Sequence, residues 1–381
     1  MRECERSGAL AGLTIVEFAG IGPGPFCGMM LADHGADVIR IERAGGRGSA
    51  GPARDVLARG RRTIAINLKS EAGIALARRL CAKADGLIEG YRPGVMERLG
   101  LGPDVLMADN PKLVYGRMTG WGQTGPYAAA AGHDINYIGL AGALAHFGRA
   151  GEKPTPPINL VGDFGGGGMM LAFGMVSALL FVARGGAGQV IDAAMTDGSA
   201  VLMAMMHSFA NSGMWSPERG TNLLDTGAHF YDTYETADGK YVSIGSIEPQ
   251  FYAALRRIVG VADDSAFDAQ MNPAAWSALR EKLAVIFKTR TRDEWDALMA
   301  GSDACYAPVL TMAEAVAHPH NVARETFVTV DGDTQPAPAP RLSATPAGMP
   351  QGATDDTGAI LAALDITPED IAEMRDAGTI D

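Results

Sequence analysis

The chain has 381 residues, of which 47% are hydrophobic and 20% charged, so it can bury a large core and is not intrinsically disordered. Its formal net charge of −12 at pH 7 excludes a general nucleic-acid-binding surface, although a local basic patch can still hold an anionic small ligand. Four cysteines without a CxxC pair, and an N-terminus without an apolar signal core, favour reduced thiols and a cytoplasmic location.

The first 120 residues alternate between short apolar strands and helices. We expect helices at 26–34 and 70–84, with Ser70 as the N-cap of the second. Strands are expected at 13–18, 37–42, 63–68, 86–89 and 113–118. Strands that alternate with helices predict an α/β fold with a parallel sheet.

The second half of the chain predicts a long apolar helix and then a smaller domain. The helix is expected at 163–184, and its apolar part, 169–183, is too short to span a bilayer and is expected to be buried. After a strand at 189–194, the texture changes near residue 222. A hairpin around Asp238-Gly239 is expected at 230–244. Further helices are expected near 251–259, 274–289, 292–300 and 368–377.

Three short motifs suggest cofactors or metals but do not fit them. The loop Gly20–Pro25 follows a strand and opens a helix, yet Pro25 stands where a dinucleotide fingerprint needs its third glycine. Its prolines also lack the N–H groups that would hold a pyrophosphate, so we interpret the loop as a tight turn. Asp163-Phe-Gly lacks the other kinase motifs, and His318-Pro-His320 lacks further ligands. We expect no metal and no bound cofactor.

Basic residues gather in the first hundred positions of this acidic chain. Several of them fall at the ends of expected strands, where α/β folds bind ligands, so a polyphosphate-bearing ligand and a solvated surface are both open interpretations. The cluster comprises Arg40, Arg43, Arg47, Arg54, Arg59, Arg61, Arg62, Lys69, Arg92 and Arg98.

His133 and Asp163 are the candidates for proton transfer. His133 belongs to the densest polar cluster, Gly132-His-Asp-Ile-Asn-Tyr137. Asp163 precedes four glycines at the start of the long helix, where an aspartate often serves only as an N-cap. A helix N-terminus also keeps a carboxylate ionised or stabilises a nearby anion. Residue chemistry alone leaves both the catalytic and the structural interpretation open.

Long stretches of the sequence resemble the family III CoA-transferases (CaiB/BaiF). They are VEFAGIGPGPFC at 16–27, LADHGAD at 31–37 and IEGYRPG at 88–94. Within that family, GHDINY at 132–137, NLVGDFGGGG at 159–168 and GSIEPQ at 245–250 resemble the α-methylacyl-CoA racemases. Residues 366–374 resemble the last helix of the family, so the similarity runs from residue 13 to the end of the chain.

This resemblance implies an interlocked homodimer with a site between the large domain of one subunit and the small domain of the other. The large domain is expected to be Rossmann-like, to cover residues 1–200 and to be completed by 325–381. A linker is expected at 201–225 and a small α+β domain at 226–324.

The resemblance also assigns roles to individual residues. It implies that the catalytic groups are His133, Asp163 and Glu248. Contacts to the CoA thioester are implied for Arg43, Ile66, Asn67, Leu68, Lys69, Arg92, Arg98, Gly132, Asp134, Ile135, Asn136 and Tyr137, with Asn159 placing the thioester or Asp163.

The resemblance, together with these residues, implies an isomerase that inverts carbon 2 of 2-methyl-branched acyl-CoA thioesters. His133 and Asp163 would exchange protons on opposite faces of an enolate, Glu248 would orient His133, and N–H groups of Gly165–Gly168 are expected to hold the enolate oxygen. One alternative is a CoA-transferase in which Asp163 attacks the thioester as a nucleophile. A regulatory acyl-CoA-binding protein without catalysis is the other. Neither nucleic acid nor a membrane is expected as a partner.

Overall fold

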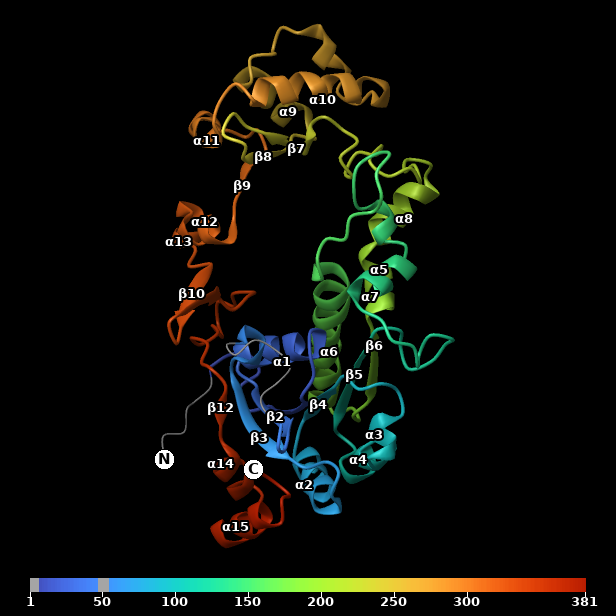
Figure 1. The fold of residues 1–381 in the computed structure, drawn as a ribbon, viewed down its shortest axis with the longest axis vertical. Helices are drawn as coiled ribbons and strands as arrows, with labels where there is room; N and C mark the ends of the chain where they lie inside the picture. The colour runs from blue at the N-terminus through green and yellow to red at the C-terminus, as the bar shows by residue number, and fades with distance from the viewer. Residues whose placement is uncertain (1–6, 47–54) are drawn as a thin grey trace. The chain divides into compact units, whose positions relative to one another are not determined.

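A computed structural model describes residues 7–46 and 55–381, which form two compact units (Figure 1). Unit 1 contains the described residues up to Ala141 together with Ile158–Leu202 and Glu325–Asp381. Unit 2 contains Gly142–Pro157 and Met203–Arg324. The domain limits inferred from the sequence stay predictions.

The centre of unit 1 is a parallel sheet of seven strands. Their order in space is β12 (Thr354–Asp355), β3 (Arg61–Ile66), β2 (Asp37–Arg43), β1 (Thr14–Phe18), β4 (Gly86–Glu89), β5 (Val114–Thr119) and β6 (Val190–Ala194). The chain moves outward from β1 to β3 and then returns to place β4 on the other side of β1. Such a reversal opens a crevice at the carboxyl ends of the strands, where doubly wound sheets bind ligands. The predicted parallel α/β fold is confirmed.

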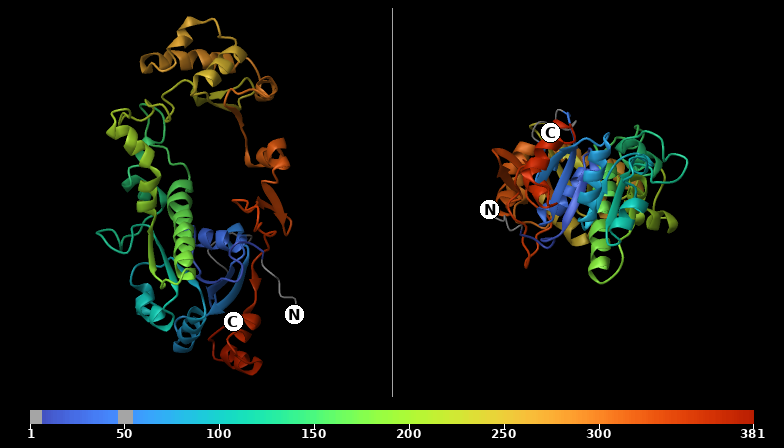
Figure 2. Two further views of the ribbon diagram at one scale, coloured as in Figure 1. Left: turned by 180° about the vertical axis from the view of Figure 1, so that it is seen from behind. Right: turned by 90° about the horizontal axis from the view of Figure 1, so that it is seen from below.

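Helices cover both faces of this sheet (Figure 2). Helices α1 (Pro23–Asp33) and α6 (Met170–Ala183) pack on one face, and α2 (Glu71–Ala82) packs on the other. The other helices of unit 1 are η1 (Val56–Ala58), α3 (Val95–Arg98), α4 (Pro103–Asp109), α5 (Asp134–Leu140), η3 (Leu160–Met169), α7 (Met195–Leu202), α14 (Thr357–Ala362) and α15 (Pro368–Asp376). A hairpin of β10 (Phe327–Val330) and β11 (Asp333–Pro336) completes the unit.

The predicted start of one helix is accurate and that of another is three residues late. Ser70 caps α2 as expected, because its hydroxyl accepts a hydrogen bond from the Gly73 N–H at 3.1 Å. Helix α1 begins three residues before the predicted Phe26, since Pro23 suits the first helical position.

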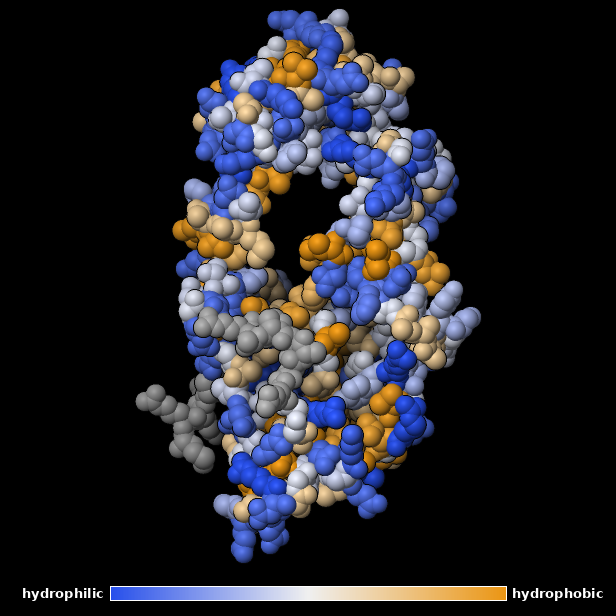
Figure 3. All heavy atoms as spheres, in the orientation of Figure 1, coloured by the Kyte–Doolittle hydropathy of each residue, from blue (hydrophilic) through white to orange (hydrophobic). Residues whose placement is uncertain are grey.

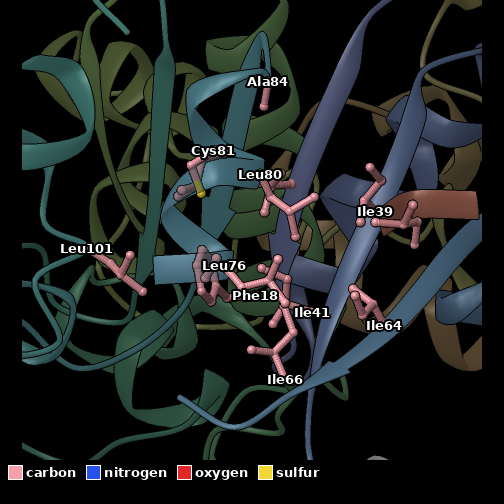
Figure 4. Packing of buried hydrophobic residues seen from close by; sticks show 14 of the residues in the cluster. Phe18, Ile39, Ile41, Ile64, Ile66, Leu76, Leu80, Cys81, Ala84 and Leu101 are labelled. Atoms are coloured by element: carbon pink, nitrogen blue, oxygen red, sulfur yellow. The ribbon is translucent and has the colours of Figure 1, made fainter. Parts of the chain in front are cut away.

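Alternate residues of each strand point to opposite faces, so the sheet separates two apolar cores. Val16 and Phe18 face the core under α2, whereas Ile15 faces the core under α1 and α6. Figure 4 shows Leu76 and Leu80 of α2 gathered with Phe18, Ile41 and Ile66 of the strands. Polar side chains cover most of the visible outer face of unit 1, with apolar patches between them (Figure 3).

Part of the basic cluster is buried rather than available to a ligand. Glu17 is fully buried on β1 and accepts hydrogen bonds from Arg40 at 3.0 Å and from Arg61 at 3.0 Å. Arg59 pairs with Asp33 at 2.5 Å. These arginines are at most 3% exposed, so the polyphosphate interpretation is wrong for them. Arg62 is also paired, with Asp37 and Asp356. Arg47 and Arg54 lie outside the described residues.

The long apolar helix begins earlier than the sequence predicts and is wound differently. Its first ten residues, Leu160–Met169, form the π-helix η3, which continues into α6. Asn159, not Asp163, is the N-cap residue, so Asp163 lies inside the first turn. Of the part of the chain that the structure describes, Leu160–Ala183 alone is helical, long and apolar enough to span a bilayer by length and composition. Its most hydrophobic 18-residue window is 44% buried within the protein.

Unit 2 is built on a small antiparallel sheet. Its strand order is β7 (Tyr231–Glu235), β8 (Tyr241–Gly245) and β9 (Tyr306–Val309), which confirms the predicted hairpin. Aromatic side chains, including Phe230, Trp276, Phe287 and Trp295, fill its core. Its helices are η2 (Leu144–His146), α8 (Ala204–Asn211), α9 (Pro249–Ile258), η4 (Ser265–Ala269), α10 (Pro273–Phe287), α11 (Arg292–Met299), α12 (Met312–Ala317) and α13 (Pro319–Ala323).

A buried histidine in this core is expected to make unit 2 sensitive to acid. His229 is fully buried, with Nε2 2.6 Å from the Tyr252 hydroxyl, and burial lowers the pKa of its imidazole from 6.5 to about 4. Because the unfolded chain binds this proton below pH 6.5 and the folded chain only near pH 4, stability is lost as the pH falls between these values. The loss should be about 3 kcal/mol in the free energy of unfolding.

Urea unfolding followed by tryptophan fluorescence from pH 7 to pH 4 measures this loss. His229→Phe should flatten the pH dependence, whereas His320→Phe, at an exposed position, should leave it unchanged. An equal slope in the wild type and His229→Phe would exclude His229 as the source.

Candidate active site

A cavity of about 630 Å³ opens at the carboxyl ends of the strands of unit 1. The loop after β1 and the loop after β4 both line it, so it lies at the switch point of the sheet. Its remaining walls come from the end of β5, the loop between β5 and α5, the start of α5, η3 with its N-cap residue, and the first residue of α7. The topology of the sheet therefore brings five separate chain segments to one site.

Asp163 reaches this cavity from η3 with both its backbone and its side chain engaged. Its N–H donates to Asp134 Oδ2 at 2.7 Å, and its Oδ2 accepts from Asn159 Nδ2 at 3.0 Å. Burial raises the pKa of the Asp163 carboxyl, and the Asp134 charge adds to this, while Asn159 and His133 act in the opposite direction. A carboxyl with a raised pKa is a stronger base than an ordinary aspartate.

His133 enters the same cavity from the start of α5. It is the N-cap residue of α5, and its N–H donates to Asn136 Oδ1 at 3.0 Å. The side chain is exposed, so the imidazole is free to meet a ligand. The structure therefore brings His133 and Asp163 to one cavity.

Glycines next to Tyr137 give the cavity its shape. The Tyr137 ring lies against Gly120 and Gly132, where a Cβ on Gly120 would come within 2.1 Å of the ring. Its hydroxyl donates to the Gly132 carbonyl, and Trp121 packs edge-on against it with ring centroids 4.7 Å apart. Side chains larger than hydrogen at these two glycines would displace the aromatic wall.

The residues predicted to contact CoA divide into two groups. Arg92, Gly132, Tyr137 and Asn159 line the cavity with the catalytic pair. The other predicted contacts are not among its lining residues: Arg43, Ile66, Asn67, Leu68, Lys69, Arg98, Asp134, Ile135 and Asn136.

Among these other residues, Ile66 is fully buried in the core, and the Asn67 side chain donates to the Gly378 carbonyl at 3.1 Å. Arg43, Lys69 and Arg98 are exposed, as a phosphate-binding role requires. Their contacts to CoA remain predictions.

Glu248 belongs to unit 2, whereas His133 and Asp163 belong to unit 1. It is the N-cap residue of α9, and burial raises the pKa of the nearby Cys305 thiol, to which the charge of Glu248 adds. Gln270 fixes the preceding backbone, because its Nε2 donates to the carbonyls of Ser246 and Ile247 at 3.0 and 2.8 Å. Its predicted catalytic role stays a prediction.

Sequence reasoning missed one part of the site and misplaced another. The loop Gly20–Pro25, interpreted as a turn, lines the cavity, and its position after the first strand was the available signal. The Gly165–Gly168 N–H groups were expected to hold an enolate. In a π-helix each N–H donates to the carbonyl five residues earlier, so these groups are used within η3.

No group of three or more His, Cys, Asp or Glu side chains in residues 7–46 and 55–381 is arranged to hold a metal ion. His318 and His320 lie at the start of α13, where the His320 N–H contacts His318 Nδ1 at 3.3 Å.

Unit 1 is a doubly wound α/β domain that carries the Asp163 carboxylate and the His133 imidazole at the switch point of its sheet. The sequence profile of CoA-transferase family III matches residues 10–356. The chain belongs to CoA-transferase family III.

Relatives of two activities are similar to the chain. The α-methylacyl-CoA racemase of Mus musculus is 49% identical over 89% of this chain and 87% of its own length, and that of Homo sapiens 46% over 89% and 88%. The succinyl-CoA–D-citramalate CoA-transferase of Chloroflexus aurantiacus is 32% identical over 88% of both chains.

A crystal structure of a CaiB/BaiF family protein from Brucella suis matches with a TM-score of 0.81 and 30% identity. The match covers 94% of this chain and 100% of the other.

Proposed function

We propose that the chain is a racemase that inverts carbon 2 of 2-methyl-branched acyl-CoA thioesters by 1,1-proton transfer through an enolate. The observation that carries this proposal is that His133 and Asp163 line one cavity at the switch point of the sheet. The identity of 46–49% to two α-methylacyl-CoA racemases supports the substrate class.

Inversion needs a base on one face of carbon 2 and a proton donor on the other. Asp163 suits the first role, because burial and the neighbouring Asp134 raise the pKa of its carboxyl. His133 suits the second, since its exposed imidazole lines the same cavity and can donate a ring N–H proton. In the reverse direction the two residues exchange roles.

The cavity walls suit a thioester that carries an apolar chain. Phe18, Ile21, Ile88, Met118 and Met195 offer apolar contacts. The glycines of the loops after β1 and β5 let the backbone approach the substrate closely. The cavity also lies at the N-terminal end of α1, whose dipole favours the negative charge that develops on the thioester oxygen.

We also propose a role for Glu248, a homodimeric assembly and a cytoplasmic location. Glu248 is assigned to orient His133 and to stabilise its imidazolium. An interlocked homodimer is supported by the apolar side chains that α6 leaves exposed, Phe173 at 73% and Leu180 at 58%. The enzyme is proposed to work in the cytoplasm without a cofactor, with CoA entering only as part of the substrate.

A single epimer of a 2-methylacyl-CoA incubated with the enzyme in D₂O tests the proposal. Epimerisation with deuterium at carbon 2 is the expected result. A substrate that keeps both its configuration and its proton, with active enzyme at high concentration, would exclude racemisation.

A CoA-transferase that uses Asp163 as its nucleophile is the second candidate, favoured by the transferases among the relatives. That reaction forms an acyl anhydride on the carboxylate and needs an acceptor acid. Hydroxylamine trapping of an acyl-Asp163 adduct, together with turnover that depends on an acceptor acid, would favour this candidate.

Arg92 is expected to contribute to binding rather than to proton transfer. It lines the cavity with an exposed guanidinium, which suits a CoA phosphate. Arg92→Ala should raise KM for the acyl-CoA about tenfold and leave kcat within about twofold, as expected for the loss of one charge-assisted contact. Initial-rate kinetics measure both constants. Arg78→Ala, which removes an exposed pair with Asp109 on α2 and α4, is the matched control and should change neither.

A further inference from the structure

Asp134 is a buried carboxylate that the reaction as proposed does not use. It is the first residue of α5, next to His133, and is only 6% exposed. Its Oδ2 accepts the N–H of Asp163 at 2.7 Å, and its Oδ1 is buried without a hydrogen-bond partner. A buried carboxylate with one unsatisfied oxygen is costly, so its retention needs a physical reason.

We propose that Asp134 is a positioning residue for Asp163, which fixes the turn of η3 that carries Asp163 and places a second carboxylate beside it. This inference rests on the proposed role of Asp163 as a base. The strength of Asp163 as a base is then set by Asp134 of α5, the helix whose N-cap residue is the opposing His133.

The packing between α5 and η3 explains how Asp134 can act on Asp163. A Cβ on Gly162 would come within 2.5 Å of Asp134 Oδ2, so the glycine before Asp163 lets the two elements meet. The N–H of Asp163 then donates across the contact instead of to solvent. A shift of Asp134 would therefore also shift the backbone of Asp163, the proposed base.

The charge of Asp134 affects the ionisation of the Asp163 carboxyl. Among the groups facing Asp163, Asp134 raises the pKa of its carboxyl, whereas Asn159 and His133 lower it. Tyr137 lies on the same helix as Asp134. Burial raises the pKa of its hydroxyl, the charges of Asp163 and Asp134 add to this, and the charge of Arg92 lowers it. The ionisable groups on the other elements packed against η3 are the buried Cys27, Asp33 and Arg117 in ion pairs, Tyr115 bonded to the Leu101 carbonyl, and the exposed Asp192 and Asp197.

Asp134→Asn tests the proposal, because asparagine keeps the shape and an acceptor for the Asp163 N–H while removing the charge. The measurement is the pH dependence of kcat/KM for deuterium exchange, with the epimer that Asp163 deprotonates. The acidic limb should move to lower pH by roughly one unit. Asp192→Asn is the matched control, since Asp192 also accepts a backbone N–H, from Gln123, and its limb should not move. An unchanged limb in folded Asp134→Asn would overturn the proposal.

A second measurement does not depend on activity or on the folding of Asp134→Asn. Coupled carboxyls perturb each other reciprocally, so Asp163→Asn should shift the titration of the Asp134 carboxyl carbon in ¹³C NMR. Independent titration of the two carboxyls would contradict the proposal even if racemisation is confirmed. Coupled titration in a protein that does not exchange the proton at carbon 2 would instead contradict the proposed function alone.

Discussion

Asp163→Asn is expected to abolish inversion of carbon 2 while leaving the fold and acyl-CoA binding in place. Asparagine is nearly isosteric with aspartate and keeps the backbone N–H that donates to Asp134. It cannot accept or deliver the proton, so kcat for inversion should fall by about 10²- to 10⁴-fold with little change in KM. Chiral chromatography of the product acyl group measures this loss.

The two epimers should respond differently to this substitution. In a two-base reaction each epimer presents its proton to one base, so Asp163→Asn should still exchange the proton that faces His133. Deuterium would then enter one epimer without inversion. His133→Gln should show the opposite preference, exchanging only the other epimer. Loss of exchange from both epimers in each variant would indicate that the residues act together on one face, which contradicts the proposed mechanism.

Much of the fold follows from local patterns in the sequence. The apolar runs at 37–42 and 86–89 lie within two buried parallel strands, since such strands need little more than apolar residues and a bounding turn. Ser70 as a cap and Asp238-Gly239 as a hairpin turn are equally local signals. What required comparison with a family was the pairing of His133 with Asp163, because residues thirty positions apart meet only through the packing of α5 against η3.

Two features of the site could not be predicted because they depend on tertiary contacts. The π-helix η3 has a sequence that an α-helix could also adopt, and its winding comes with glycine contacts to α1 and α7. A Cβ on Gly168 would come within 2.7 Å of Phe26, and one on Gly166 within 2.7 Å of the Ser199 backbone. The burial of Arg40 and Arg61 could not be predicted either, since arginine is usually exposed. Burial is tolerated here because both guanidiniums pair with Glu17 of β1 and donate to backbone carbonyls.

Glu17→Gln is expected to destabilise unit 1 more than substitution of an ordinary polar residue. Glu17 is the shared partner of two guanidiniums that are each 1% exposed. Removing its charge leaves Arg61 without the carboxylate that pairs with it and leaves Arg40 with the longer contact to Glu42, at 3.5 Å. Breaking a buried pair in this way costs about 3–5 kcal/mol, against a total stability of about 5–15 kcal/mol for a typical domain. Urea unfolding followed by far-UV circular dichroism measures the loss. Asp109→Asn, which breaks the exposed pair with Arg78, should cost less than about 1 kcal/mol.

The same arginines also link this buried charge cluster to the cavity. Arg40 donates to the Gly20 carbonyl at 3.4 Å and Arg61 donates to the Pro25 carbonyl, so they hold both ends of the loop that lines the site. Replacing all three residues with apolar ones, as Glu17→Met, Arg40→Leu and Arg61→Leu together, should restore much of the stability, because the unpaired charges are gone. It should not restore kcat, because the loop loses its two anchors. Recovery of both stability and kcat would show that the cluster serves the fold alone, whereas recovery of stability alone would assign it a part in positioning the cavity wall.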